Sequence, residues 1–356
     1  MIGLSLLTLV PGASGAGIER YARDLCRGLG RYGSRAYVAL LPTVAPDAAD
    51  GIPGRVISAY PASRSLAGRA AAMAFAVARP GRVAREMLAG GMEALHYPLT
   101  VMIPPVTRVP AAVTITDVQH EVHPEFFSAP ERLYRKWIYA RTAKRARVVI
   151  TISRFSADSL MRHLGVAAGK IRVIPLGIDP ERFGGGSGAR EPFLLYPANF
   201  WPHKNHARLF EAFRLVRAKR PELTLVLTGA GHGGLALPEG VVSRGLVSDD
   251  DLVRLYQTAS ATVFPSLWEG FGLPPVEAMA CGCPVVVSRG TSLPEVCGDA
   301  ARYVDPLSPA DIASGIEDVL RNPAGLVEAG RRRAALFTLE ACVRAHDAVY
   351  GELLTS

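Results

Sequence analysis

The chain has 356 residues and a mass of 38.0 kDa, which is enough for two domains of ordinary size. Hydrophobic residues make up 49% of the chain and charged residues 20%, a balance that excludes a disordered, collagen-like or disulfide-stapled protein. The net charge of +8 comes entirely from residues 1–183, which carry 24 Lys and Arg against 13 Asp and Glu, a net +11, whereas residues 184–356 carry 16 against 19. A basic half of this kind makes nucleic acid, acidic lipid or a phosphorylated ligand the candidate partners.

The cysteines and the hydropathy pattern indicate the compartment. Five cysteines are an odd number at irregular spacing, without a Cys-x-x-Cys pair, so we expect buried free thiols in a reducing, cytoplasmic setting. The apolar start, residues 1–10, lacks a preceding positive segment and predicts a buried strand instead of a signal peptide. No run of 18 or more apolar residues occurs, so the sequence predicts no membrane-spanning helix. The cysteines are Cys26, Cys281, Cys283, Cys297 and Cys342.

In the first half, short β-branched segments alternate with longer Ala-, Leu- and Arg-rich stretches of helical period. This alternation predicts βα units on a parallel sheet. The expected strands are residues 4–10, 37–41, 112–116, 148–153 and 172–175, and the expected helices lie near residues 17–31, 65–90, 130–146 and 154–164.

Two loops of the first half are candidate binding segments, because ligands of open α/β sheets bind where strands run into helices. Residues 11–17 are Gly-rich and precede a helix whose free amides can hold phosphate or sugar; a tight strand-to-helix turn explains the glycines equally well. Residues 114–124 place Asp117 and His120 among polar side chains at a strand end. These two residues can recognise a hydroxyl, and a helix cap or a satisfied loop residue is the alternative.

The Gly-rich segment 184–188 predicts a linker. We therefore expect an N-terminal domain over residues 1–183, a C-terminal domain over 184–335 and a C-terminal helix, 336–356, that packs back on the first domain. The second half repeats the βα pattern. Its expected strands are residues 193–197, 224–228, 261–264 and 285–288, and its expected helices lie near residues 205–219, 249–258, 274–280 and 308–321, with a long helical stretch from Gly330 to Ser356.

Two loops of the second half carry charged residues in positions that favour an anionic ligand. Lys204 stands near a helix start, where a cation gains nothing from the helix dipole unless an anion binds there. Glu269 precedes Gly270 and Gly272 in a loop, and Glu277 follows in what we expect to be the first helical turn, where a carboxylate complements the dipole. Carboxylates accept hydroxyl hydrogen bonds while free amides hold phosphate, so this loop suits a sugar nucleotide.

The same segment resembles a known enzyme family. Glu269 to Glu277 is similar to the E-x7-E motif of retaining glycosyltransferase family 4, and the resemblance extends over residues 145–310. It is carried by Val173-Ile174-Pro175-Leu176-Gly177-Ile178-Asp179, Trp201-Pro202-His203-Lys204-Asn205, Gly245-Leu246-Val247-Ser248-Asp249, Phe264-Pro265-Ser266, Glu269-Gly270-Phe271-Gly272-Leu273-Pro274, Pro284-Val285-Val286 and Leu293-Pro294-Glu295-Val296.

The resemblance implies an α/β GT-B fold, in which two Rossmann-like doubly wound domains face each other across a cleft. It also implies that the donor binds mainly to the C-terminal domain and the acceptor to the N-terminal one. It implies that Glu269 lies beside the transferred sugar, that Glu277 binds the ribose and that Lys204 neutralises the diphosphate. It further implies that backbone amides donate to sugar or phosphate at Phe271, Gly272 and Leu273, and that the nucleotide is bordered by Gly229, with its base beside Leu246 and Val247. Ala16 and Gly17 correspond to the glycine pair of the family's first domain.

This chain departs from the family pattern at two places. The family often carries Arg a few residues before its Lys, where this chain has Ala198 and Asn199, so we include Asn199 among the expected donor-binding residues. A His before the Asp of the second loop is common in the family, whereas this chain reads Thr116-Asp117. His120 is the alternative contact to the sugar, and we count Asp117 and His120 with Lys204 and Glu269 as candidate catalytic residues.

The expected reaction is transfer of a sugar, with retention, from a nucleoside diphosphate to a hydroxyl of a glycan or lipid-linked acceptor. GDP-mannose is the expected donor, since the context of Lys204 resembles bacterial mannosyl-transferring members; no metal and no cofactor are expected. Residues Asp249–Asp251 resemble a metal motif, but they follow Ser248 at a helix start, so N-capping explains them better.

Three alternatives remain open. The first is another sugar-nucleotide enzyme of similar fold, such as a UDP-sugar epimerase. The second, a nucleic-acid-binding protein that uses the basic half, is disfavoured because the aromatic residues near 134–139 read as one side of an amphipathic helix. The third concerns location: basic helices at 61–92 and 130–147 can rest on anionic lipid at the inner face of the plasma membrane, or simply pack with solvated Arg.

Overall fold

The computed structural model describes residues 1–12, 16–186, 189–234 and 236–355, and it divides the chain into two compact units. Unit 1 comprises Met1–Leu176 and Leu339–Ser356, and unit 2 comprises Gly177–Thr338. The change of unit therefore comes before the boundary that we expected after residue 183. Ile178 explains the difference, since its N–H donates to the Phe337 carbonyl at 2.9 Å and ties this segment to unit 2. Ser187 and Gly188 of the expected linker lie outside the described residues.

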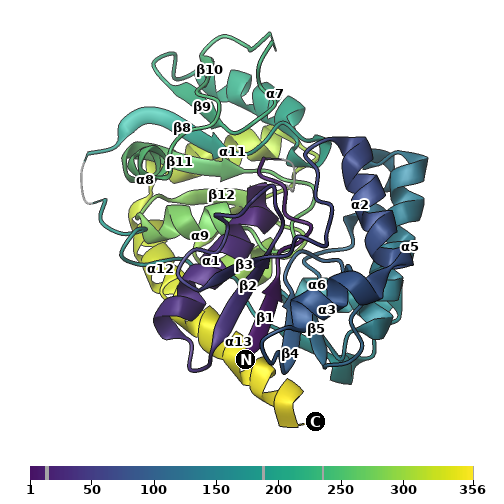
Figure 1. Ribbon diagram of the computed structural model, residues 1–356. Helices are drawn as coiled ribbons and strands as arrows, with labels where there is room; N and C mark the ends of the chain where they lie inside the picture. The colour runs from purple at the N-terminus through teal and green to yellow at the C-terminus, as the bar shows by residue number, and fades with distance from the viewer. Residues whose placement is uncertain (13–15, 187–188, 235, 356) are drawn as a thin grey trace. The chain divides into compact units, whose positions relative to one another are not determined.

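Unit 1 is built on a seven-stranded sheet in which every neighbouring pair is parallel (Figure 1). The strand order is β3-β2-β1-β4-β5-β6-β7. The strands are β1 (Ile2–Ser5), β2 (Tyr37–Leu41), β3 (Gly54–Val56), β4 (Ala94–Tyr97), β5 (Ala111–Thr114), β6 (Val148–Thr151) and β7 (Ile171–Val173).

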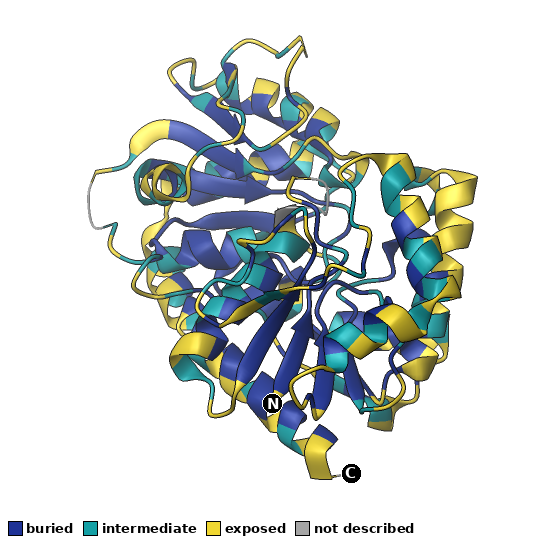
Figure 2. Cartoon of the chain, in the orientation of Figure 1, coloured by how far each residue is buried: buried dark blue, intermediate teal, exposed yellow. Residues whose placement is uncertain are grey.

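Helices cover both faces of this sheet. The helices are α1 (Ala16–Tyr32), α2 (Leu66–Ala78), α3 (Pro80–Leu88), α4 (Gln119–Val122), α5 (Ala129–Arg145), α6 (Arg154–Leu164) and α13 (Leu339–Thr355), with short 3-10 turns η1 (Pro124–Phe126) and η2 (Ala168–Lys170). Successive strand residues point to opposite faces, so Leu41 packs with α1 and α13 while Leu40 packs in the core that includes α2, α3, α5 and α6. Both faces of the central strands are therefore apolar, as in other parallel sheets, and Figure 2 shows these strands as buried, whereas the edge strand β3 is largely exposed.

Three details of the expected elements are wrong, two in the first half and one in the second. Strands β3 and β4 were not expected, because they are only three and four residues long, and β4 contains Ala and His, which have little strand preference. The helix expected over 65–90 is two helices, since Pro80 starts a new one after Arg79. The stretch from Gly330 is likewise divided, into α12 (Ala324–Ala334) and α13.

A buried chain of hydrogen bonds fastens α13 to unit 1. Tyr350 bonds to His96 Nδ1 at 2.8 Å, and His96 Nε2 bonds to Thr114 Oγ1 at 2.8 Å. Thr114 Oγ1 continues to the Tyr21 hydroxyl at 2.9 Å, and that hydroxyl reaches His346 Nε2 at 2.8 Å. Burial lowers the pKa of His346 to about 4 and that of His96 well below its usual value, so both imidazoles are neutral. The C-terminal helix is therefore part of the core of unit 1.

Unit 2 has a six-stranded parallel sheet in the order β10-β9-β8-β11-β12-β13. Its strands are β8 (Glu191–Pro197), β9 (Thr224–Thr228), β10 (Val241–Ser243), β11 (Ala259–Phe264), β12 (Val285–Ser288) and β13 (Ala301–Val304). Its helices are α7 (His206–Arg217), α8 (Asp249–Thr258), α9 (Leu273–Ala280), α10 (Leu293–Cys297), α11 (Pro309–Arg321) and α12, with the 3-10 turn η3 (Pro202–Lys204).

The order of strands determines where a ligand can enter. In chain order unit 2 reads 3-2-1-4-5-6, the arrangement of doubly wound nucleotide-binding domains, and the order reverses between β8 and β11. In doubly wound folds, ligands bind outside the carboxyl ends of the strands, at the point where the strand order reverses. The candidate site should therefore lie after Pro197 and after Phe264.

Among the residues that the structure describes, no helix combines the length and the hydropathy needed to cross a membrane.

Candidate functional site

Lys204 and Glu269 meet at the point where the strand order of unit 2 reverses. The Lys204 ammonium donates to Glu269 Oε1 at 2.6 Å, and it also lies 4.9 Å from the centre of the Phe264 ring. Both side chains are mostly buried, with exposed fractions of 13% and 12%. A charge-assisted bond of this length in a partly buried site is a strong one. Two charged residues that are 65 positions apart in the sequence thus form one unit.

The loop after β8 is held against the loop after β11 by backbone and amide hydrogen bonds. Asn205 has a left-handed backbone, φ 62°, and its amide donates to the carbonyls of Pro265 at 3.0 Å and Pro306 at 2.7 Å. The Leu267 N–H donates to the His203 carbonyl at 2.8 Å. These bonds fix the position of Lys204, which lies between His203 and Asn205. The family motif Trp-Pro-His-Lys-Asn therefore includes a residue, Asn205, whose contribution is to orient the loop.

The turn from Glu269 to Gly272 is fixed from the next strand. The hydroxyl of Ser292, which follows β12, donates to the carbonyls of Glu269 at 3.0 Å and Phe271 at 2.9 Å. Gly272 has φ 103° and immediately precedes α9, and a Cβ there would lie 2.5 Å from Cδ2 of Leu293. Only glycine fits this position without a shift. The backbone of residues 270–273 is thus presented at the start of α9 in one defined arrangement.

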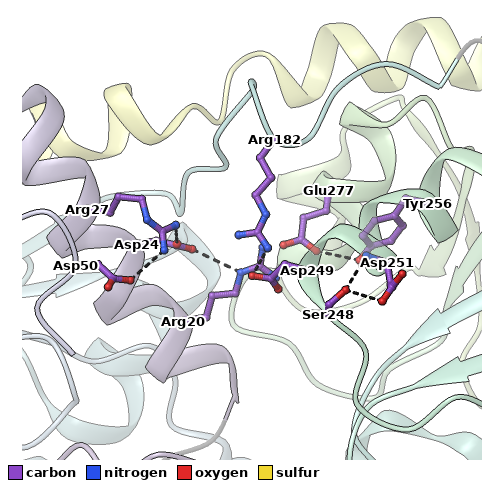
Figure 3. A network of polar contacts seen from close by, with 10 residues as sticks. All are labelled: Arg20, Asp24, Arg27, Asp50, Arg182, Ser248, Asp249, Asp251, Tyr256 and Glu277. Atoms are coloured by element: carbon purple, nitrogen blue, oxygen red, sulfur yellow. Dashed lines mark hydrogen bonds and ion pairs between the residues drawn. The ribbon is translucent and has the colours of Figure 1, made fainter. Parts of the chain in front are cut away.

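Glu277 lies in the second turn of α9, which corrects our expectation of the first turn, because the helix begins at Leu273. The side chain is 1% exposed, and its Oε2 accepts a hydrogen bond from the Tyr256 hydroxyl of α8 at 2.9 Å (Figure 3). At this depth in the helix, dipole complementation does not explain a carboxylate. Burying a carboxylate costs free energy of folding unless its oxygens are hydrogen-bonded. Because the helix dipole does not explain Glu277, its burial favours a function in ligand binding.

Ser248 caps the helix that begins with the three aspartates, as we expected from the sequence. The Ser248 hydroxyl accepts from the Asp251 N–H at 3.1 Å and caps α8, and Asp249 forms an ion pair with Arg182 (Figure 3). Asp251 pairs with Arg254 at 2.5 Å. The carboxylates of Asp249 and Asp251 are therefore engaged in ion pairs, and that of Asp251 also accepts from the Ser248 hydroxyl.

The loop after β9 is joined to the loop after β8. Gly229 has φ 130°, its N–H donates to the Gly245 carbonyl at 2.8 Å, and a Cβ would lie 2.7 Å from the Ala198 carbonyl oxygen. Asn199 Oδ1 accepts from the Ala230 N–H at 2.8 Å. Gly229 therefore allows two backbone segments to approach closely, and Asn199 orients the loop that the family resemblance assigns to the nucleotide.

Two buried histidines reinforce the same junction. His206 Nε2 and His232 Nε2 lie 3.4 Å apart, and burial, the main cause, lowers the pKa of His206 to about 3.

The residues expected at the nucleotide base, Leu246 and Val247, follow β10. Leu246 is 78% exposed and Val247 is half-buried. Leu246 thus offers an apolar side chain to solvent at the carboxyl edge of the sheet.

The candidate residues of unit 1 are less closely organised. Gly17 is the second residue of α1, and a Cβ there would meet open space. Asp117 Oδ1 accepts from the Gln119 N–H at 3.0 Å. His120 is 2% exposed and packs edge-on against Tyr139 at 4.8 Å, and burial lowers its pKa to about 4. The imidazole is thus covered by Tyr139, and its contact with the sugar stays a prediction. Residues 13–15 of the first glycine-rich loop lie outside the described residues.

The structure therefore brings the candidates of unit 2 to one edge of its sheet, after β8, β9, β10 and β11. Sequence reasoning missed three residues that position them: Tyr256, Ser292 and Asn205. Asn205 was inside the quoted motif, and Ser292 follows a strand end next to Leu293, which are usable signals. Tyr256 lies in an amphipathic helix without any local signal. Chemically, this edge offers a cation, two carboxylates and a glycine-rich helix entrance, the groups that suit a phosphorylated sugar.

Two family descriptions together match nearly the whole chain. "Glycosyltransferase Family 4" matches residues 15–182, and "Glycosyl transferases group 1" matches residues 178–335. Their junction lies close to the change from unit 1 to unit 2.

Curated relatives point in the same direction. The chain is 31% identical over 239 residues to MMP alpha-(1->4)-mannosyltransferase of Mycolicibacterium hassiacum, covering 61% of this chain and 58% of that one. It is 31% identical over 218 residues to O-antigen chain mannosyltransferase B of Escherichia coli, covering 55% and 57%, and 30% identical over 220 residues to O-antigen chain mannosyltransferase RfbU of Salmonella typhimurium, covering 59% and 61%. The matches thus span about three fifths of the length of these relatives.

Solved structures share the fold over almost the full length. A sucrose-phosphate synthase from Thermosynechococcus elongatus superposes with a TM-score of 0.80 at 22% identity, covering 99% of both chains. Anabaena HepE, solved with UDP and glucose, gives a TM-score of 0.73 at 20% identity and covers 98% of this chain and 99% of its own. The two Rossmann-like domains and the structural neighbours show the GT-B fold. Because the two family descriptions match adjoining parts of the chain, the chain belongs to glycosyltransferase family 4.

Proposed function

We propose that the protein is a retaining glycosyltransferase that moves mannose from GDP-mannose to a hydroxyl of a glycan or lipid-linked saccharide. The observation that carries this proposal is the Lys204–Glu269 pair at the reversal of strand order, with Glu277 on the helix that follows. The names of three relatives as mannosyltransferases support the choice of sugar.

The reaction separates charge, and the residues of unit 2 are suited to that task. The bond between the anomeric carbon and the phosphate oxygen breaks, its electron pair stays on the diphosphate, and the acceptor oxygen bonds to the anomeric carbon from the same face. The acceptor proton passes to the departing phosphate oxygen. Lys204 and the amides at the start of α9 stabilise the negative charge on the diphosphate, and Glu269 accepts hydrogen bonds from the sugar. No metal ion and no further cofactor take part in this scheme.

Binding and turnover test the proposal together. In a thermal-shift screen of GDP, UDP, dTDP and their sugars, we expect the strongest stabilisation from GDP ligands; a ligand at 100 times its dissociation constant adds about 2.7 kcal/mol. With an acceptor present, NMR of the product should show the anomeric configuration of the donor, and EDTA should leave the rate unchanged. An inverted product contradicts the retaining mechanism. No response to any nucleotide contradicts the transferase proposal as a whole.

We also propose that unit 1 binds anionic lipid at the cytoplasmic face of the membrane, where a lipid-linked acceptor would lie. Leu133 and Trp137 are one helical turn apart on α5 and are 71% and 49% exposed. The Tyr134 hydroxyl of α5 contacts Met73 of α2 at 3.4 Å, and the two helices lie side by side (Figure 1). Exposed apolar residues with a basic border favour the interface of an anionic membrane. The exposed basic residues of α5 are Arg132, Lys136, Lys144 and Arg145.

Liposome co-sedimentation tests this surface. The wild-type protein should sediment with vesicles that contain phosphatidylglycerol and not with phosphatidylcholine alone, and Leu133→Ser with Trp137→Ser should reduce the bound fraction. Leu215→Ser, at a residue of unit 2 that is 46% exposed, is the matched control and should have no effect. Equal sedimentation of the double variant and the wild type would remove α5 from the proposal.

A further inference from the structure

The cation at the candidate donor site is already neutralised by its neighbour. Lys204 is bonded to Glu269 at 2.6 Å in a partly buried position, and Glu277 stands close in sequence on α9 with its own bond to Tyr256. As an ion pair, Lys204 and Glu269 together carry no net charge. A diphosphate that enters this site therefore meets an ammonium group whose charge is balanced, and a carboxylate beside it. A lysine that is neutralised by a glutamate is unexpected in a site that serves only to bind anions with high affinity.

The ligands of the proposed reaction differ in the charge that they bring to this pair. In a nucleoside diphosphate sugar, both phosphates are esterified and each carries about one negative charge. After transfer, the terminal phosphate becomes a monoester with a second pKa near 6, so at neutral pH it carries nearly one further negative charge. The donor also has the hydroxyls of the sugar to be transferred, which can donate hydrogen bonds to a carboxylate, and the product nucleotide has lost that sugar and keeps only its ribose hydroxyls.

We propose that Glu269 selects the nucleoside diphosphate sugar against the nucleoside diphosphate that the reaction leaves behind. Beside the donor, its carboxylate accepts hydrogen bonds from the sugar, which compensates for the loss of its bond to Lys204. Beside the product, the same carboxylate faces a more highly charged phosphate and has lost the hydroxyls of the transferred sugar. Like charges held close together in a partly buried site repel strongly, so the product is released and competes poorly with fresh donor. This inference rests on the proposed function.

Lys204 is needed for this selection, because its charge reduces the repulsion between the Glu269 carboxylate and the terminal phosphate. The hydrogen bond from Asn205 to the Pro265 carbonyl holds the loop that carries Lys204, and the ammonium lies 4.9 Å from the centre of the Phe264 ring. Glu277 cannot replace Glu269 in this respect, because its Oε2 is bonded to Tyr256 on the neighbouring helix. The carboxylate that discriminates is thus the one in the loop after β11.

Calorimetry with three ligands separates charge from hydroxyl recognition. The ligands are GDP, the β-methyl ester of GDP, which lacks the extra charge and the sugar, and GDP-mannose. In Glu269→Gln we expect the affinity for GDP to rise about tenfold relative to that for the methyl ester, which corresponds to about 1.4 kcal/mol. GDP-mannose should gain less than the methyl ester, since the amide is a weaker acceptor for the sugar hydroxyls. Inhibition by GDP relative to KM for the donor should strengthen accordingly.

Glu211→Gln is the matched control, because it removes the same charge from an exposed position on α7 of the same unit. It should change the ratio of GDP to methyl-ester affinity by less than about twofold. Equal gains for GDP and its methyl ester in Glu269→Gln, or the same ratio in both variants, would overturn the inference while leaving the proposed function standing. The uridine series is measured in parallel, and binding of neither series by the wild type would overturn the proposed function itself.

Discussion

Gly272→Ala tests whether the loop before α9 has the conformation described above. Gly272 has φ 103° and ψ 55°, and a Cβ would lie 2.5 Å from Cδ2 of Leu293, which is fully buried. A non-glycine residue in this backbone region costs about 1–3 kcal/mol. Overpacking against a fixed side chain costs about another 1–3 kcal/mol. We therefore expect unit 2 to lose about 2–6 kcal/mol of unfolding free energy.

Urea unfolding, followed by the fluorescence of tryptophan, measures this loss. Trp268 is 6% exposed and lies in the same loop, so its emission reports on unit 2. With a slope of about 2 kcal/mol per molar urea, a loss of 3 kcal/mol lowers the midpoint by about 1.5 M. Gly233→Ala is the control, since a Cβ there meets open space, and it should change the free energy by no more than about 0.5 kcal/mol. A change in Gly272→Ala as small as that of the control would refute the reasoning.

Three further predictions concern single side chains. Lys204→Ala should weaken GDP binding in calorimetry, because the ammonium beside the diphosphate is lost; equal affinity would count against its assignment. Tyr256→Phe removes a hydrogen bond to the Glu277 carboxylate and should lower the free energy of unfolding in urea by about 1.5–3 kcal/mol. Tyr303→Phe is the control, because the Tyr303 hydroxyl donates to a neutral backbone carbonyl, and it should lower the free energy of unfolding by only ~1 kcal/mol. Burial lowers the pKa of His346 to about 4, so between pH 6.5 and 4 the unfolded chain binds a proton that the folded chain does not. The free energy of unfolding should therefore fall as the pH is lowered through that window. His346→Asn should flatten this pH dependence, and an unchanged slope would contradict the prediction.

The expected chemistry at Lys204, Glu269 and Glu277 came from local signals. A carboxylate before two glycines and a lysine before a helix are unusual enough to notice in a sequence, and the family resemblance assigned them a donor site. The bond between Lys204 and Glu269 could not be predicted in the same way, because it depends on β8 and β11 being neighbours in the sheet. The burial of Glu277 against Tyr256 likewise depends on how α8 and α9 pack.

His120 shows the opposite case. In the sequence it is a polar residue at a strand end and a natural candidate for contact with a substrate. In the structure its ring packs against Tyr139 of α5, a helix that begins nine residues later, and burial keeps it neutral. Local sequence cannot distinguish a histidine that is open to substrate from one that is covered by a later helix.

The sequence by itself determined the class of fold, the family and the residue types of the donor site, since alternating βα segments, glycine turns and charged loop residues are local patterns. Only the tertiary structure decided which short strands complete the sheets, where unit 1 gives way to unit 2, and which charges face each other. Strand β4 illustrates the reason: Ala94–Tyr97 has a weak strand pattern and is stabilised by pairing with β1 and β5 on either side. Pairing, burial and charge neutralisation are properties of neighbours that are distant in the chain.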